Sequence, residues 1–214
     1  MCRDELPKDL TMAELDFARY PMTYAIIFVN VVISGYAFFV DSDLINRWSL
    51  QVGSILKGGQ YHRVLTSGFL HADPTHFLFN MVTLFFFGRT MELILGPIGF
   101  LALYFGSELA ANGLSLWSRR NELYYASIGA SGAVCGVLLA YCLLFPLGEI
   151  HMFMLPVGIP AFLYAGIFIA YSIYATDRGD GIAHEAHLGG ALGGIVIMCL
   201  LYPGALSAFF SNFS

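Results

Sequence analysis

The chain has 214 residues, of which 57% are apolar and only 12% are charged, and its mean hydropathy is +0.70. A soluble globular domain carries about 25% charged residues, so this composition excludes a water-soluble fold and indicates a membrane protein. The net charge of −5 comes without a polybasic run, which argues against nucleic acid as a partner. The lipid bilayer is therefore the first partner that we expect.

The chain begins with a polar stretch and continues into apolar segments. Residues 1–21 lack the basic region and short apolar core of a cleavable signal peptide, so we expect a polar N-terminal segment followed by an uncleaved first span. Residues 22–203 are expected to form one domain, and residues 204–214 a short C-terminal tail. The apolar segments of the domain run over 22–40, 76–95, 97–116, 130–146, 152–175 and 184–203.

These six segments are close to the length of about 20 residues that crosses a hydrocarbon core. They predict an all-α membrane protein built as a bundle of six transmembrane helices. The longest connection, residues 41–75, contains Trp48 and several apolar residues. Loops of this length are usually functional or associated with the membrane surface.

Polar residues open three of the predicted spans. His76 and Asn80 open the second span, Ser131 the fourth and His187 the sixth. A polar side chain at membrane depth is costly and is a functional candidate by default. Because the amino ends of all even spans lie on one side of the bilayer, these four residues can share one cavity. The loop charges give no clear orientation, with four Lys and Arg residues on one side and six on the other.

Ser131 is the candidate nucleophile. It lies in Gly129-Ala130-Ser131-Gly132, where two glycines remove Cβ bulk and allow a neighbouring helix to come close. The start of a helix also offers unpaired N–H groups to a developing oxyanion. The alternative interpretation is ordinary packing, because small residues are common where membrane helices meet.

His187 is the candidate general base. Gly190 and Gly194 follow it at four-residue spacing, a pattern that lets the sixth span press against the glycine-rich start of the fourth. Such packing would bring the imidazole within hydrogen-bonding reach of the Ser131 hydroxyl. A packed or pore-lining histidine is the alternative, and His184 is the rival base.

His76 and Asn80 are candidate oxyanion donors. They are four residues apart and therefore lie on one face of a helix, where both side chains can point at one oxygen. Hydrogen bonding between helices is the alternative role.

The sequence offers no clear third member for a triad, so a Ser–His dyad is the simplest prediction. Glu185 is two residues from His187 and points away from it on a helix. Glu108 lies in the middle of the third span and needs a hydrogen-bond partner, and the roles of Glu108 and His184 stay open. No metal site is predicted, because His184-Glu185-Ala186-His187 has the wrong spacing for a zinc-binding helix.

Taken together, these residues resemble the rhomboid family of intramembrane serine proteases over about residues 60–200. Several linked motifs carry the resemblance in the expected order. They are Arg63 in the first loop, His71 with His76 and Asn80, Gly88, Glu92 and Gly96 as GxxxExxxG, Gly129, Ser131 and Gly132 as GxSG, and His187, Gly190 and Gly194 as AHxxGxxxG.

The resemblance implies a water-filled cavity in a six-span bundle, with Ser131 as nucleophile and His187 as general base and acid. It implies an oxyanion hole made of His76, Asn80 and the Ser131 amide, and it implies no cofactor. The substrates would be single-span or multi-span membrane proteins. We further expect a bacterial inner (plasma) membrane, with the N-terminus in the cytosol and the active site facing outside. The sequence indicates no oligomeric state.

The sequence departs from the family pattern at two places. A Trp-Arg pair is replaced by His62-Arg63, and the aromatic residue that many members place four positions after the serine is Cys135. Two other functions are left open by the residues alone. One is an inactive rhomboid-like protein that binds membrane clients, and the other is a small transporter with a proton path through His76, His187 and Glu108.

Overall fold

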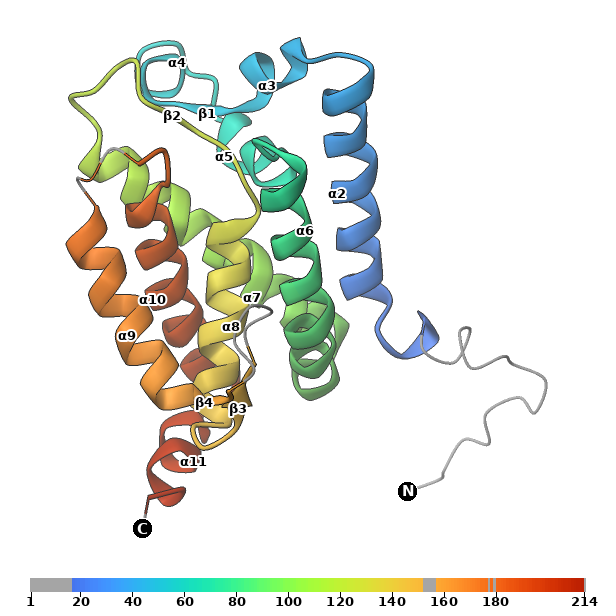
Figure 1. Cartoon of the computed structure of the whole chain (residues 1–214), viewed down its shortest axis with the longest axis vertical. Coiled ribbons are helices and arrows are strands. Elements are labelled where there is room, and N and C mark those ends of the chain that lie inside the picture. The colour runs from blue at the N-terminus through green and yellow to red at the C-terminus, as the bar shows by residue number, and fades with distance from the viewer. Residues whose placement is uncertain (1–16, 152–156, 177, 179, 214) are drawn as a thin grey trace.

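The computed structural model describes residues 17–151, 157–176, 178 and 180–213. Most of the predicted polar segment, residues 1–16, lies outside the described residues, as do residues 152–156 of the fifth predicted span. Figure 1 shows a bundle of helices with short connecting elements at both of its ends. The main helices are α2 (Pro21–Phe39), α6 (Pro74–Thr83), α7 (Arg89–Ser118), α8 (Ser131–Leu144), α9 (Ala161–Ala175) and α10 (His184–Leu201).

Short elements connect these helices. The helical ones are α3 (Asp43–Trp48), α4 (Val52–Leu56), α5 (Arg63–Thr66), η1 (Ser67–Phe69), the π-helical turn η2 (Leu84–Gly88) and α11 (Ala205–Ser211). The strands are β1 (Leu50–Gln51), β2 (Ala126–Ser127), β3 (Glu149–Ile150) and β4 (Ile159–Pro160). The described part of the chain is thus mainly helical, as predicted.

Three stretches of the described chain are long and apolar enough to cross a membrane: Pro21–Phe39, Pro74–Ser118 and His184–Leu201. The second stretch has 45 residues, and it contains a break at Gly96, whose φ of 70° is outside the helical range. Pro97 follows directly and starts a new helical segment. The apolar helices α8 and α9 have 14 and 15 residues, fewer than the ~20 that a full crossing needs.

Helix α8 lies at the centre of the bundle and packs on α7 and α10. Eleven of its residues are buried, whereas α9 buries only Ala161, Ser172 and Ala175. The remaining face of α9 exposes large apolar side chains such as Ile167, as expected for a helix that faces lipid. The core is therefore centred on α7, α8 and α10, with Ile26 of α2, Met81 of α6 and Leu84 of η2 added to it, and α9 packs on one side.

Glycines set the distance between α8 and α10. A Cβ atom built on Gly190 would lie less than 3.0 Å from the backbone of Gly132, and one built on Gly194 would meet the backbone of Gly136 in the same way. Side chains cannot be accommodated at such an approach, so the two backbones touch directly. Gly190 and Gly194 therefore allow α10 to pack closely against α8, as their spacing predicted.

Two residues of the predicted motifs fix the edges of the bundle. The Glu92 carboxylate accepts hydrogen bonds from Met22 N, Thr23 N and Thr23 Oγ1 at 2.7–2.8 Å, and so satisfies the first amides of α2. Buried Arg63 donates to the carbonyl oxygens of Asn46 and Ser49 at 2.8 and 2.9 Å. Arg63 thereby holds the first loop together, although the residue before it is His62 and not the tryptophan of the family pattern.

The long first loop is anchored to the segment that leads into α8. Strand β1 pairs with β2 in an antiparallel manner, with Leu50 opposite Ser127. The loop therefore reaches the chain just before Ser131, and it forms the cap seen at the top of Figure 1.

The fifth predicted span starts too early, and part of the predicted C-terminal tail is helical. Strands β3 and β4 form a hairpin with Ile150 opposite Ile159, and α9 begins only at Ala161. An apolar run alone cannot distinguish a buried hairpin from the start of a helix, which is why the sequence placed this boundary wrongly. Within the predicted tail 204–214, residues Ala205–Ser211 form α11.

We predict that Gly190→Ala destabilises the protein, because the new Cβ would collide with the Gly132 backbone rather than with a flexible side chain. Overpacking of this kind typically costs about 1–3 kcal/mol. Gly166→Ala on α9 is the matched control, since a Cβ atom added there would meet nothing within 4 Å and alanine favours helix. Thermal unfolding in detergent micelles measures both variants, and equal melting temperatures would contradict the proposed backbone contact.

Candidate functional site

The structure brings Ser131 and His187 into hydrogen-bonding contact. Ser131 is the first residue of α8 and His187 lies in the first turn of α10, and the two helices touch through the glycines described above. The distance between His187 Nε2 and Ser131 Oγ is 2.9 Å. A neutral imidazole with its proton on Nδ1 would accept the hydroxyl proton at this distance.

A cavity of about 1010 Å³ opens beside this pair. Ser131, His187, His76 and Asn80 all lie on its wall, so the four residues that open the even spans do share one space. The wall continues with Phe79, Ile128, Val134, Cys135, Leu138 and Tyr164. Charged side chains also line it, namely Asp73, Arg119, Glu122 and Asp180, so the cavity combines an apolar wall with several polar groups.

Gly129 makes room for His76. Its φ of 133° disfavours other residues, and a Cβ atom there would lie 2.6 Å from His76 Cε1. Helix α6 begins beside it with Asp73 as N-cap, whose carboxylate accepts from His76 N at 2.9 Å. Asn80 Nδ2 donates to the His76 carbonyl oxygen at 2.9 Å. That contact uses one of its two N–H groups and leaves the other for the cavity.

His71, in the segment before α6, packs against the His76 ring. It is fully buried, and its Nδ1 lies 2.8 Å from Ser34 Oγ, which itself donates to the Phe69 carbonyl oxygen. The His71 ring meets the His76 ring edge to face, with centroids 5.1 Å apart. Burial lowers the pKa of His71 to about 3, so that the ring stays neutral and packs as an apolar wall.

An aromatic ring from α9 lies against the candidate base. Phe168 and His187 are stacked at 28° with ring centroids 6.3 Å apart, and Tyr164 is stacked on Phe168 in turn. Phe168 was not among the predicted site residues, because the family pattern places the stacking aromatic at position 135 on α8. The four-residue spacing of Tyr164 and Phe168 was the available signal for a shared helix face. Among the described residues, none accepts a hydrogen bond from His187 Nδ1.

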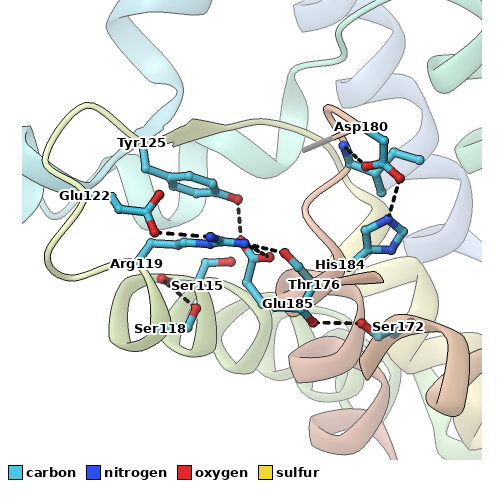
Figure 2. A network of polar contacts seen from close by, with 11 residues as sticks. Ser115, Ser118, Arg119, Glu122, Tyr125, Ser172, Thr176, Asp180, His184 and Glu185 are labelled. Carbon is cyan, nitrogen blue, oxygen red and sulfur yellow. Dashed lines mark hydrogen bonds and ion pairs between the residues drawn. The ribbon is translucent and has the colours of Figure 1, made fainter. Parts of the chain in front are cut away.

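The two neighbours of His187 have other partners. His184 Nε2 lies 3.1 Å from Asp180 Oδ2, and this hydrogen bond lowers the pKa of the Asp180 carboxyl. Glu185 faces away from His187, and its carboxylate accepts from the Tyr125 hydroxyl and from Arg119 Nη2 (Figure 2). The His184 ring also meets the His187 ring edge to face, with centroids 6.0 Å apart, but the hydrogen bond to Ser131 is made by His187.

Glu108 of α7 lies behind the start of α8, where Ser131 is located. Its carboxylate accepts from Asn112 Nδ2 at 2.8 Å and from Ala133 N at 3.3 Å. Asn112 also donates to the Val64 carbonyl oxygen at 2.7 Å, and so ties α7 to the first loop. Glu108 makes no hydrogen bond to a histidine within the described ranges, which does not favour the proton path of the transporter hypothesis.

Comparisons with other proteins place the chain in one family. The family model of the Rhomboid domain matches residues 58–204. The mitochondrial Rhomboid protein 1 of Saccharomyces cerevisiae is 30% identical over 84% of this chain and 54% of its own length. YdcA, a rhomboid homologue of Bacillus subtilis, is 28% identical over 82% of this chain and 83% of its own. The mitochondrial presenilin-associated rhomboid-like protein of Rattus norvegicus is 34% identical over 62% of this chain and 36% of its own length.

These comparisons correct the predicted location. We expected a bacterial inner membrane with the N-terminus in the cytosol and the active site facing outside, and this expectation is wrong, because the yeast and rat relatives are mitochondrial proteins. An apolar span satisfies any bilayer in the same way, and the balance of four against six basic residues gave no orientation. The residues therefore contained no information on the kind of membrane.

The match to relatives is unequal in length. The chain spans about half the length of the yeast protein and about a third of the rat one. The chain covers most of YdcA, and the Rhomboid domain match accounts for more than half of the residues of this chain. On the strength of this domain match, the chain belongs to the rhomboid family.

Proposed function

We propose that this protein is an intramembrane serine endopeptidase that cleaves transmembrane segments of membrane proteins through a dyad of Ser131 and His187. The observation that carries the proposal is the 2.9 Å contact between His187 Nε2 and Ser131 Oγ on the wall of a large cavity within the helices. The provisional name of YdcA as a rhomboid protease agrees with it.

In the proposed reaction, Ser131 Oγ attacks the scissile carbonyl carbon while His187 Nε2 takes the hydroxyl proton. The tetrahedral intermediate collapses to an acyl-enzyme as the imidazolium gives this proton to the leaving amine. A water molecule, deprotonated by the same nitrogen, then hydrolyses the ester and restores Ser131. No metal or organic cofactor is needed for these steps.

The developing oxyanion needs donors on the far side of the carbonyl. The amide at the start of α8, the His76 ring and the free N–H of Asn80 are the groups that we assign to it. The Ala133 amide is not among them, because Glu108 already accepts its proton at 3.3 Å. The glycine at 129 has a part in this, since it lets the His76 ring lie beside the serine loop.

Two further parts of the proposal concern the membrane. We infer six crossings, namely α2, the two halves of Pro74–Ser118 on either side of Gly96, α8, α9 and α10, with residues 22–203 as the catalytic domain. The names of the yeast and rat relatives favour a mitochondrial membrane. Fractionation of cells that express the full chain tests the location, and recovery in another membrane would reject it.

An inactive client-binding protein and a transporter are the competing functions. Neither requires a hydrogen bond between Ser131 and His187, and Glu108 is engaged by Asn112 and Ala133 rather than by a histidine. Reaction of the serine with an active-site probe separates a hydrolase from both.

We predict that a fluorophosphonate probe labels the purified protein in detergent, and that Ser131→Ala and His187→Ala each abolish labelling and cleavage of a single-span reporter. Loss follows because the first variant has no nucleophile and the second has no proton acceptor. His184→Ala is the histidine control: the His184 ring meets the His187 ring edge to face, but its Nε2 lies against Asp180 rather than Ser131, so this variant keeps both dyad groups and should keep most of the activity. Full activity in either dyad variant would remove the assignment.

We predict that His76→Ala and Asn80→Ala lower kcat more than they raise KM. The wild-type His76 and Asn80 side chains are assigned to stabilise negative charge that exists only in the transition state, so their loss affects the chemical step more than substrate binding. The loss of one oxyanion donor typically costs on the order of 10²–10³ in rate, and redundancy with the backbone amide would reduce it. Steady-state kinetics on the reporter measure the two constants. An unchanged kcat in the double variant would return both residues to a packing role.

We predict that substrate spans are cleaved faster where their helix unwinds easily. A transmembrane helix keeps its carbonyl groups in internal hydrogen bonds, so the nucleophile reaches one only after local unwinding. A reporter with Gly or Pro near the cut should be cleaved faster than a Leu-rich version of equal length. Initial rates under identical detergent conditions test this, and equal rates would show that unwinding is not limiting.

A further inference from the structure

A buried ionic cluster lies at the start of the helix that carries the base (Figure 2). Glu185, the second residue of α10, exposes only 3% of its side chain. A carboxylate at this depth is strongly unfavourable unless donors compensate it. Two donors do so, the hydroxyl of Tyr125 and Nη2 of Arg119, the latter at 3.5 Å.

Arg119 extends the cluster to two more segments. It follows the last residue of α7, and its guanidinium donates to the Thr176 carbonyl oxygen at the end of α9 and to Glu122 at 3.1 Å. The Tyr125 ring lies beside the guanidinium, 5.4 Å from its carbon. The ends of α7 and α9 and the start of α10 are thus joined through one side chain.

The first turn of α10 lacks the usual means of fixing a helix start. Its N-cap residue is Ala183, which has no side-chain acceptor for the first amides. Two contacts hold this turn: His184 Nε2 lies 3.1 Å from Asp180 Oδ2, and Glu185 joins the turn to Tyr125 and Arg119, with His187 only two residues further on. Because no described residue accepts a hydrogen bond from His187 Nδ1, the position of the imidazole depends on this turn and on the rings of Phe168 and His184 that lie against it.

The same cluster reaches the segment that carries the nucleophile. Tyr125 precedes β2, and its carbonyl oxygen accepts from Val52 N at 3.1 Å, which fixes it to the first loop. From β2 the chain runs directly to Ser131. The bond between Tyr125 and Glu185 consequently bridges the two segments that hold the serine and the histidine.

We propose that Glu185 is a positioning residue for His187, acting through Tyr125 and Arg119 to hold the first turn of α10 at hydrogen-bonding distance from Ser131. This inference rests on the proposed protease function. Arg119 and Tyr125 line the cavity, whereas Glu185 is not among its lining residues and does not contact the reacting atoms, so its role differs from that of a third triad member.

Two conservative variants test the proposal. Tyr125→Phe removes one hydroxyl and keeps the ring beside Arg119, and Glu185→Gln removes the charge with little change of size. A misplacement of reacting groups by about 1 Å can cost on the order of 10² in rate, so we expect kcat to fall between tenfold and a hundredfold in both variants. KM should stay within twofold in Glu185→Gln, and this KM is the diagnostic one, because Tyr125 itself lines the cavity. The rate at which the fluorophosphonate labels Ser131 should fall in parallel.

A double-mutant cycle and a matched control separate positioning from general destabilisation. If Tyr125 and Glu185 act through their mutual contact, the double variant should be little worse than the poorer single one. Asp43→Asn is the control, because it removes an exposed ion pair with Arg47 at 3.1 Å on α3 and should leave kcat unchanged. An unchanged kcat per labelled site in both single variants would overturn the proposal, as would full additivity in the double variant.

Hydrogen exchange gives a readout that does not need activity. Glu185→Gln in the full chain should raise amide exchange at residues 184–190 and leave α2 unchanged. Exchange that stays at the wild-type level overturns the anchoring role whatever the kinetics. If exchange rises but the wild-type protein neither reacts with the probe nor cleaves the reporter, the proposed function fails while the anchor stands.

Discussion

The contact between the backbones of α8 and α10 is the constraint on which the rest of the site depends. At Gly132–Gly190 and at Gly136–Gly194 there is no room for a Cβ atom, so the two helices lie as close as helices can. Ser131 and His187 each stand at the start of one of these helices and meet at 2.9 Å because of it. A side chain at the crossing would separate the two groups without touching either of them.

Buried carboxylates hold the remaining helices around this pair. Glu92 of α7 accepts from the first amides of α2, Glu108 of α7 accepts from Ala133 in α8, and Glu185 of α10 accepts from Tyr125 before β2. Each one joins two elements that are far apart in the sequence, and each is satisfied by donors that would otherwise be buried unpaired. Because apolar contacts are not directional, these few hydrogen bonds help to fix how the helices are oriented against each other.

Much of the candidate site could be predicted because it depends on the spacing of residues within single helices. The four-residue intervals between His76 and Asn80 and between Gly190 and Gly194 define helix faces, and parity puts the starts of the even spans together. Phe168 could not be found in this way, because its contact with His187 depends on how α9 lies against α10. The Arg119–Glu185 pair is separated by 66 residues and leaves no periodic trace. The hairpin at β3 and β4 was hidden in an apolar run, and the kind of membrane has no signature in such residues.

The short length of α9 has a consequence for the lipid around the protein. Its 15 residues rise about 22 Å, less than the ~30 Å hydrocarbon core of a typical bilayer. In the proposed arrangement of six crossings, the acyl chains beside the exposed apolar face of α9 would compress to match it, at a cost of a fraction of a kcal/mol for each Å of mismatch. Since α9 also carries the Phe168 ring that lies against His187, the thickness of the surrounding bilayer would then act on the helix that supports the base. Bilayer thickness and the orientation of one imidazole would thereby be mechanically linked.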